Sequence, residues 1–248
     1  MSEIVLVTGG GRGIGAEICR LAAQQGYAVA INYRSDEDSA QQLREELTTA
    51  GATAITLQAD VAREPEVEAM FTALDKQLGR LTALVNNAGI VAPQARLLDM
   101  DAARIDRIMQ TNVTGSFLCA REAVRRMSTA TGGAGGSIVN VSSAASRLGS
   151  PDEYIDYAAS KGAIDTLTIG LSKEVGAEGI RVNAVRPGVI YTDIHASGGD
   201  PGRVDRIGPG APLGRGGYPQ EVAQAIVWLL SEQASYTTGS FIEVSGGR

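Results

Sequence analysis

A glycine-rich segment, TGGGRGIG at residues 8–15, separates the first apolar run of the chain from a helical pattern. Gly9, Gly13 and Gly15 carry the spacing of a turn whose backbone can approach a pyrophosphate closely, and a following helix offers unpaired N–H groups to its negative charge. A tight turn without a ligand would explain the glycines alone. Their place at a strand-to-helix junction favours a dinucleotide site, and a nucleoside-triphosphatase loop is excluded because no Gly-Lys-Ser/Thr follows.

Short apolar runs alternate with longer helical patterns along all 248 residues. The predicted strands are 4–8, 28–33, 54–59, 83–88, 137–142, 181–186 and 240–244. The predicted helices are 14–25, 36–50, 64–79, 101–128, 155–178 and 219–233. Strands that are apolar almost throughout are typical of a parallel sheet buried on both faces. The sequence therefore predicts a single doubly wound α/β domain over residues 1–248, with a seven-stranded parallel sheet and helices on both faces.

Composition excludes several function classes. With a formal net charge of −6, the chain is a poor candidate for binding nucleic acid or an anionic membrane surface. Its apolar runs are shorter than the roughly 18 residues that a membrane-spanning helix needs. The two cysteines, Cys19 and Cys119, lie outside any metal-ligand spacing and favour a reducing cytoplasm over a disulfide framework. His195 is the only histidine, so we expect no metal site and no Ser–His–Asp triad.

The end of the second predicted strand, at Asn32-Tyr33-Arg34, bears on the choice of cofactor. A site for NAD usually has an acid about 20 residues beyond the glycines, where it binds the ribose 2′-hydroxyl. No acid stands there, and Arg34 with Arg12 could instead hold a 2′-phosphate, although both could equally be solvated. Asp36 and Asp38 match the cap and first turn of the next helix. The sequence favours NADP(H) over NAD(H).

Tyr157 and Lys161 stand four residues apart in the predicted helix 155–178, and so they share one helix face. A phenol near pKa 10 is a poor acid or base at neutral pH, but a nearby ammonium group lowers that pKa. The pair is therefore suited to proton transfer if it faces a cleft. A chance pair on a helix surface would explain the spacing alone, so the interpretation depends on the neighbouring motifs.

Hydroxyl and amide side chains stand where other predicted strands end. Ser142 and Ser143 close one strand, and the segment NNAG at residues 86–89 closes another. Such positions can reach the crevice where open α/β sheets bind ligands. A strand-end hydroxyl that only satisfies the backbone is the alternative for Ser142. Asn112 lies inside the predicted helix 101–128, a poor place for Asn unless its side chain has a partner.

Together these motifs resemble the short-chain dehydrogenase/reductase family in its single-domain form, over essentially the whole chain. The resemblance rests on residues 8–15, Asp60-Val61, residues 86–89, Asn112, Ser142-Ser143, Tyr157-Ala158-Ala159-Ser160-Lys161, and Pro187-Gly188 followed by Thr192. Within the family, the pattern is most similar to bacterial glucose-1-dehydrogenase-like and 3-oxoacyl-thioester reductase-like members. The TGGGRGIG form and the short length argue against the longer sugar-epimerase branch.

The resemblance implies a Rossmann fold and a hydride transfer between a nicotinamide and a carbonyl or secondary alcohol. It implies that Tyr157 is the general acid/base and that Lys161 lowers its pKa. It also implies that Ser143 holds the substrate oxygen and that Asn112 supports Lys161. The cofactor-binding residues that it implies are Gly9, Arg12, Gly13, Ile14, Gly15, Arg34, Asp60, Val61, Asn87, Ala88, Gly89, Tyr157, Lys161, Pro187, Gly188, Ile190 and Thr192. The family's serine usually lies one residue nearer the tyrosine than Ser143 does, so we infer an inserted residue in the turn PDEYID and favour Ser143 over Ser142.

The segment 191–217 is long, irregular and rich in Gly and Pro, which predicts a substrate lid. Its Arg203, Arg206 and Arg215 could meet an anionic substrate or carrier, or could be solvated. His195, early in this segment, could touch the substrate, but we interpret it as a solvated loop residue. The resemblance implies a small-molecule carbonyl or alcohol substrate and a homo-oligomer, either a tetramer or a dimer.

A second hypothesis from another class is a catalytically silent protein that binds a dinucleotide as a sensor. Such a protein would keep the fold and carry a damaged site. The four catalytic-type positions, Asn112, Ser143, Tyr157 and Lys161, are all present in this sequence. The sequence therefore favours the enzyme.

Overall fold

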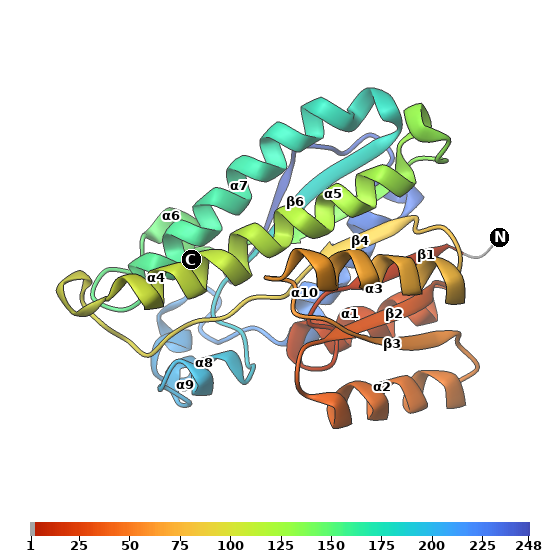
Figure 1. Ribbon diagram of the computed structural model, residues 1–248. Coiled ribbons are helices and arrows are strands. Elements are labelled where there is room, and N and C mark those ends of the chain that lie inside the picture. Colours follow the sequence, from red (N-terminus) through yellow and green to blue (C-terminus); the bar gives the residue numbers. More distant parts are fainter. Residues whose placement is uncertain (1–2) are drawn as a thin grey trace.

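The computed structural model describes residues 3–248 and is built around one parallel sheet (Figure 1). Seven strands follow the order β3-β2-β1-β4-β5-β6-β7, and every neighbouring pair is parallel. They are β1 (Ile4–Val7), β2 (Ala28–Tyr33), β3 (Ala54–Gln58), β4 (Ala83–Asn86), β5 (Gly136–Val141), β6 (Ile180–Pro187) and β7 (Phe241–Val244). The predicted doubly wound fold is confirmed. The strand order reverses between β1 and β4, and ligands bind beyond the carboxyl ends of strands at such a point.

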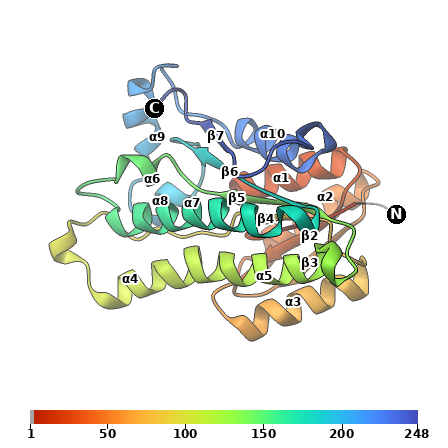
Figure 2. The ribbon, with the colours of Figure 1, turned by 90° about the horizontal axis from the view of Figure 1, so that it is seen from above.

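Helices cover both faces of the sheet (Figure 2). They are α1 (Gly13–Gln24), α2 (Glu37–Thr49), α3 (Glu64–Gln77), α4 (Ala102–Met109), α5 (Gly115–Met127), α6 (Ala145–Leu148), α7 (Ile155–Val175), α8 (Ile194–Ser197), α9 (Arg203–Ile207) and α10 (Pro219–Leu230). Val5 and Val7 of β1 pack into the core with α1, α2 and α10, whereas Ile4 and Leu6 pack into the core with α3, α5 and α7. Since strand side chains alternate between faces, two cores explain why β1 is apolar at every position.

The predicted helix 101–128 is not continuous. A five-residue π-helical turn, Gln110–Thr114, separates α4 from α5 and contains Asn112. The Asn112 Oδ1 accepts a hydrogen bond from the Ile90 N–H at 2.8 Å, and its Nδ2 donates to the Ile90 carbonyl at 3.0 Å and to the Ser160 Oγ at 3.1 Å. The expectation of one helix was wrong here, and the partner that a buried Asn needs lies in the loop after β4. Such π-helical turns frequently mark functional sites.

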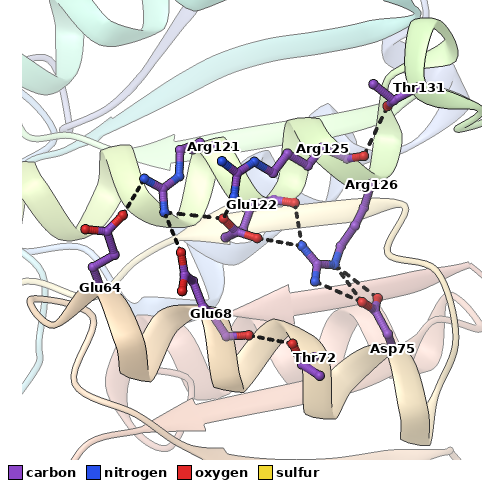
Figure 3. A network of polar contacts seen from close by, with 9 residues as sticks. All are labelled: Glu64, Glu68, Thr72, Asp75, Arg121, Glu122, Arg125, Arg126 and Thr131. Atoms are coloured by element: carbon purple, nitrogen blue, oxygen red, sulfur yellow. Dashed lines mark hydrogen bonds and ion pairs between the residues drawn. The ribbon is translucent and has the colours of Figure 1, made fainter.

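An ion-pair network joins α3 to α5 on one face of the molecule (Figure 3). At its centre is the Glu122 carboxylate, whose side chain is only 5% exposed. The Arg126 Nη1 lies 2.9 Å from Glu122, and the Nη2 of the same side chain lies 2.9 Å from Asp75 on α3. Arg121 makes a second link, 2.6 Å from Glu64. A buried carboxylate is tolerated only when it is paired in this way, so the network fixes the two helices against each other.

The predicted lid, 191–217, contains short helices rather than irregular chain throughout. It includes α8, α9 and a 3₁₀ turn at Gly208–Gly210. An isolated bridge between Ile190 and Gly217 closes the base of the segment. Figure 1 places α8 and α9 at the end of the molecule where α4 and α7 begin. The lid therefore lies beside the first turns of the helix that carries Tyr157.

Candidate active site

The glycine loop after β1 is shaped by close backbone contacts. Gly9 and Gly13 have φ angles of +60° and +54°, which side-chain-bearing residues rarely adopt. A Cβ on Gly15 would lie 2.3 Å from the Gly9 carbonyl oxygen and 2.7 Å from the Asn87 Nδ2. The Asn32 Oδ1 accepts from the Gly9 N–H at 3.1 Å, and the Asn87 Nδ2 donates to the Gly9 carbonyl at 3.0 Å. The side-chain amides of Asn32, which is buried, and Asn87, which is half-buried, thus hold the loop in one conformation.

A cleft of about 500 Å³ begins at this loop, follows the carboxyl ends of the strands and reaches the lid. All of the residues predicted to bind the cofactor lie in its wall: Gly9, Arg12, Gly13, Ile14, Gly15, Arg34, Asp60, Val61, Asn87, Ala88, Gly89, Tyr157, Lys161, Pro187, Gly188, Ile190 and Thr192. Ser143 also lines it. Asn112 is 1% exposed and lies behind the wall. The structure brings the predicted residues together, while their roles in binding and catalysis stay predictions.

Tyr157 and Lys161 occupy the first turns of α7 and face the cleft together. The Lys161 Nζ lies 5.6 Å from the centre of the Tyr157 ring and donates to the Val141 carbonyl at 2.7 Å. Ser143 follows β5, lines the same cleft and lowers the pKa of the Tyr157 phenol. The Ser143 Oγ also accepts from the Ala145 N–H at 3.1 Å, which fixes its direction. A phenol, a hydroxyl and an amine therefore converge at one place in the cleft.

Burial is the main cause of the pKa shifts of Tyr157 and Lys161. It raises the pKa of Tyr157 above its ordinary value, and the hydrogen bond with Ser143 only partly offsets this. Burial also lowers the pKa of Lys161 to about 8, opposed by the negative charge of Asp165. The phenol pKa is therefore raised in the folded chain, while the expected effect of Lys161 on it stays a prediction.

The two neighbouring serines have different environments. The Ser142 hydroxyl donates to the Asp165 Oδ1 at 2.6 Å and also lies 3.3 Å from the Lys161 carbonyl oxygen. Arg186 holds the same carboxylate, with its Nη2 2.9 Å from the Asp165 Oδ2. Ser142 is thus engaged in a structural network, whereas Ser143 lines the cleft beside Ala144 and lowers the pKa of Tyr157. This difference favours Ser143 as the serine that meets the substrate.

The arginines near the end of β2 are more weakly held. The Arg12 Nη1 lies 3.8 Å from the Asp36 Oδ2, and the two side chains are 62% and 43% exposed. An exposed pair of this kind contributes little to stability. Asp36 also accepts from the Ser39 N–H at 3.2 Å, which confirms its predicted role as the N-cap of α2. Arg34 is exposed and lies in the cleft wall. Both arginines are therefore placed at the cleft with donors to spare for an anionic group.

The lid arginines are all ion-paired, which neither sequence alternative anticipated. Arg203 pairs with Glu153, Arg206 with Asp200, and Arg215 with Glu221. These partners were missed because no local spacing connects residues such as Glu153 and Arg203, which are 50 positions apart.

His195 is half-buried rather than solvated, so the interpretation of it as a solvated loop residue was wrong. Its Nε2 lies 2.9 Å from the Ile190 carbonyl oxygen, and burial lowers its pKa. The side chain lines the cleft on the substrate side of the lid.

Residues 3–248 contain neither a metal-ion cluster nor a membrane-spanning helix. No group of three or more His, Cys, Asp or Glu side chains in this range is placed to hold a metal ion. No helix in the same range combines the length and the apolar character needed to cross a membrane. The cleft is therefore the feature of the described chain in which chemistry-bearing side chains converge.

Comparison with known proteins identifies the family. A family model described as enoyl-(acyl carrier protein) reductase matches residues 9–248. The chain is 62% identical over 245 residues to "Uncharacterized oxidoreductase YgfF" of Escherichia coli (strain K12), covering 99% of both chains. The chain belongs to the short-chain dehydrogenase/reductase family. Members of this family bind nicotinamide cofactors and act on CH–OH or carbonyl groups, so the chain is an oxidoreductase of that class.

Other members of the short-chain dehydrogenase/reductase family resemble it over their full lengths. The chain is 36% identical to the 3-oxoacyl-[acyl-carrier-protein] reductase FabG of Staphylococcus aureus (strain MW2), covering 100% of this chain and 98% of that one. It superimposes on the crystal structure of acetoin dehydrogenase YohF from Salmonella typhimurium with a TM-score of 0.88 and 36% identity, covering 100% and 97% of the two chains. The names of these two relatives refer to different substrates, so family membership alone does not define the substrate.

Proposed function

We propose that this protein is an NADP(H)-dependent oxidoreductase that interconverts a carbonyl compound and a secondary alcohol, with Tyr157 as general acid/base. The observation that carries the proposal is that Tyr157, Ser143 and Lys161 all lie in the wall of the cleft that starts at the glycine loop. Lys161, on the same helix face, completes the group. A hydroxyl aimed at a phenol is what an enzyme needs to hold and protonate one substrate oxygen.

The glycine loop fits a dinucleotide. Gly13 begins α1, where the first helical N–H groups have no partner within the helix. A Cβ on Gly13 would lie 3.5 Å from the Thr192 Cγ2, so the missing side chain keeps open the space between the loop and the lid. Arg12 and Arg34 flank that end of the cleft, and their guanidinium groups suit a 2′-phosphate. The bound NADPH would supply the hydride.

The side chains would then manage the proton. Because burial raises the pKa of Tyr157, the phenol is protonated at neutral pH and donates that proton to the substrate oxygen when the carbonyl carbon is reduced. Ser143 donates a hydrogen bond to the same oxygen and stabilises the charge that develops on it. Lys161, with a pKa of about 8, is mostly protonated at pH 7 and stabilises the phenolate that remains. Asn112 positions Lys161 from behind the wall of the cleft.

The proposal extends to assembly and compartment. Phe117 on α5 is 49% exposed and Ile169 on α7 is 43% exposed, so these helices present apolar side chains to solvent. We propose that they meet in a homo-oligomer, a dimer or a tetramer. Cys19 and Cys119 are free and buried, as expected of a chain that works in a reducing cytoplasm.

The experiment combines cofactor titration with turnover. NADPH and NADH are titrated by fluorescence into the wild type and into Tyr157→Phe, and both proteins are screened against ketones, 3-oxoacyl thioesters and aldoses. We expect tighter binding of NADPH than of NADH. We expect Tyr157→Phe to keep that binding and to lose turnover by about 10²–10⁴-fold, because the proton donor is gone.

Two outcomes would contradict parts of the proposal. Tighter binding of NADH would show that Arg12 and Arg34 do not select the cofactor. Tight NADPH binding with no turnover of any carbonyl or alcohol would support the alternative, a catalytically silent dinucleotide sensor.

A further inference from the structure

At the substrate end of the cleft, the lid residue Arg203 is held against the turn that precedes α7. Its Nη1 and Nη2 donate to the two carboxylate oxygens of Glu153, at 2.7 and 2.5 Å. Its guanidinium carbon lies 5.1 Å from the centre of the Tyr154 ring. Arg203 is 9% exposed and lines the same cleft as Tyr157 and Ser143. The buried Arg203 guanidinium therefore lines the cleft that also contains Tyr157 and Ser143. Both of its terminal nitrogens already donate to Glu153.

The turn that carries Glu153 is itself fixed. Ser150 and Asp152 have φ angles of +46° and +61°, uncommon for residues other than glycine. The Glu153 carbonyl accepts from the Ala95 N–H at 3.1 Å, which joins the turn to the loop after β4. The Arg203 guanidinium lowers the pKa of Glu153, so the carboxylate is charged at neutral pH. The pair is thus formed before any ligand arrives.

This pair decides the electrostatics of the substrate space. A substrate carboxylate or phosphate placed there would find the buried Arg203 already neutralised by Glu153. Arg248 also lines the cleft, but it is exposed, and an exposed charge is screened by water. Lys161 is committed to the reacting centre and to the Val141 carbonyl. An uncharged substrate needs no cation in the cleft wall, so the neutralisation of Arg203 does not weaken its binding.

We propose that Glu153 is a specificity-determining residue that restricts this enzyme to uncharged carbonyl and alcohol substrates by occupying Arg203. This inference rests on the proposed function, since it concerns the substrate of the same site. Removal of the Glu153 charge leaves Arg203 in place as a buried cation without its counter-ion. The variant Glu153→Gln should therefore accept carboxylate substrates that the wild type rejects.

The test measures binding of a matched pair, methyl pyruvate and pyruvate, by calorimetry. All proteins are loaded with NADPH and carry Tyr157→Phe, so that no turnover disturbs the titration. We expect the background protein to bind methyl pyruvate at least about tenfold more tightly than pyruvate. We expect Glu153→Gln to raise the affinity for pyruvate by about tenfold and to change that for the ester little, as one charge pair gained in a buried site predicts.

Two further variants separate charge from disruption of the lid. Glu221→Gln frees Arg215, an arginine that does not line this cleft, and should leave both affinities unchanged. Glu153→Gln combined with Arg203→Met removes the freed cation and should abolish the gain in pyruvate binding. Thermal unfolding checks that each protein is folded.

The inference is overturned if the background protein binds pyruvate as tightly as the ester, or if Glu153→Gln gains no affinity for pyruvate. A gain that persists without Arg203 would also overturn it. Failure of the proposed function has a different signature, because the wild type would then bind no NADPH or would reduce no carbonyl.

Discussion

The two ends of the cleft differ in what lines them: backbone atoms at one end and side chains at the other. At the cofactor end, the glycine loop presents backbone to the cleft, and Asn32 and Asn87 hold that backbone in place. At the substrate end, the wall consists of side chains from α7 and the lid, held by the pair between Arg203 and Glu153. We expect the first end to recognise its ligand by a fixed backbone shape that fits any dinucleotide. We expect the second end to recognise its ligand by charged and hydroxyl side chains, which a few substitutions can change.

The charged side chains at the two ends also differ in how far they are exposed to solvent. Arg12 at the cofactor end is 62% exposed, whereas the side chain of Arg203 is 10% exposed. Exposed pairs are worth about 0–1 kcal/mol, while breaking a buried pair by removing one partner costs about 3–5 kcal/mol. We therefore expect cofactor preference to be easy to shift and substrate charge preference to be sharply set. Variants that damage one end alone would test whether the ends are independent.

The largest effect is expected from Ser143→Ala, which breaks the catalytic end and leaves the cofactor end intact. Loss of a hydrogen-bond donor to the substrate oxygen should lower kcat/KM by about 10²–10³-fold. The affinity for NADPH should stay unchanged. Steady-state kinetics and a fluorescence titration of the same protein measure both quantities.

Ser142→Ala is the matched control for this prediction. Its hydroxyl donates to Asp165, so its loss should lower the free energy of unfolding by about 1 kcal/mol and leave kcat/KM almost unchanged. If Ser142→Ala loses activity and Ser143→Ala keeps it, the two serines have been assigned the wrong way round.

Gly15→Ala should have the opposite effect and damage the cofactor end alone. The new Cβ would lie 2.3 Å from the Gly9 carbonyl oxygen, a contact that the loop can relieve only by moving. Overpacking of this kind costs about 1–3 kcal/mol, and we expect the affinity for NADPH to fall by about 100-fold. Gly176→Ala, with open space around its Cβ, is the control and should bind NADPH normally. Normal NADPH binding by Gly15→Ala would show that the shape of the loop does not control affinity.

The glycine-loop end of the cleft could be predicted from sequence because its signals are local. The spacing of Gly9, Gly13 and Gly15 and the order of strands and helices determine the loop, the sheet and the edge where the cleft lies. The i, i+4 spacing likewise placed Tyr157 and Lys161 on one face. In each case the residues that interact are neighbours along the chain, or belong to strands whose alternation with helices fixes their order.

The substrate end could not be predicted in the same way. The contact of Arg203 with Glu153 joins residues 50 positions apart, and it depends on how the lid folds back over the turn before α7. The π-helical turn at Asn112 depends on the backbone of Ile90 in another loop. The raised pKa of Tyr157 depends on how much water the folded chain removes. Tertiary packing decides all three, and no spacing in the sequence encodes it.

The smallest effect concerns Lys161, which lies where the two ends meet. Its pKa of about 8 is below the ordinary value near 10.4, so the folded protein carries the cost of a buried ammonium at pH 7. Lys161→Met should raise the free energy of unfolding by about 2 kcal/mol. That figure is the cost of about 3 kcal/mol from the pKa difference, less about 1 kcal/mol for the lost hydrogen bond to Val141.

The pH dependence distinguishes this cause from better packing. Below pH 8, Lys161 is charged in both the folded and the unfolded chain, and its cost is fully present. Between pH 8 and about 10.4 the folded protein loses the proton while the unfolded chain keeps it, so the wild type becomes more stable relative to Lys161→Met. Urea unfolding at pH 7 and pH 9.5 should show the gap between the two proteins shrinking, with Lys173→Met as the exposed-lysine control. A difference in unfolding free energy that stays constant with pH would mean that methionine stabilises by packing alone. The buried charge of Lys161 would then not be what lowers the stability of the wild type.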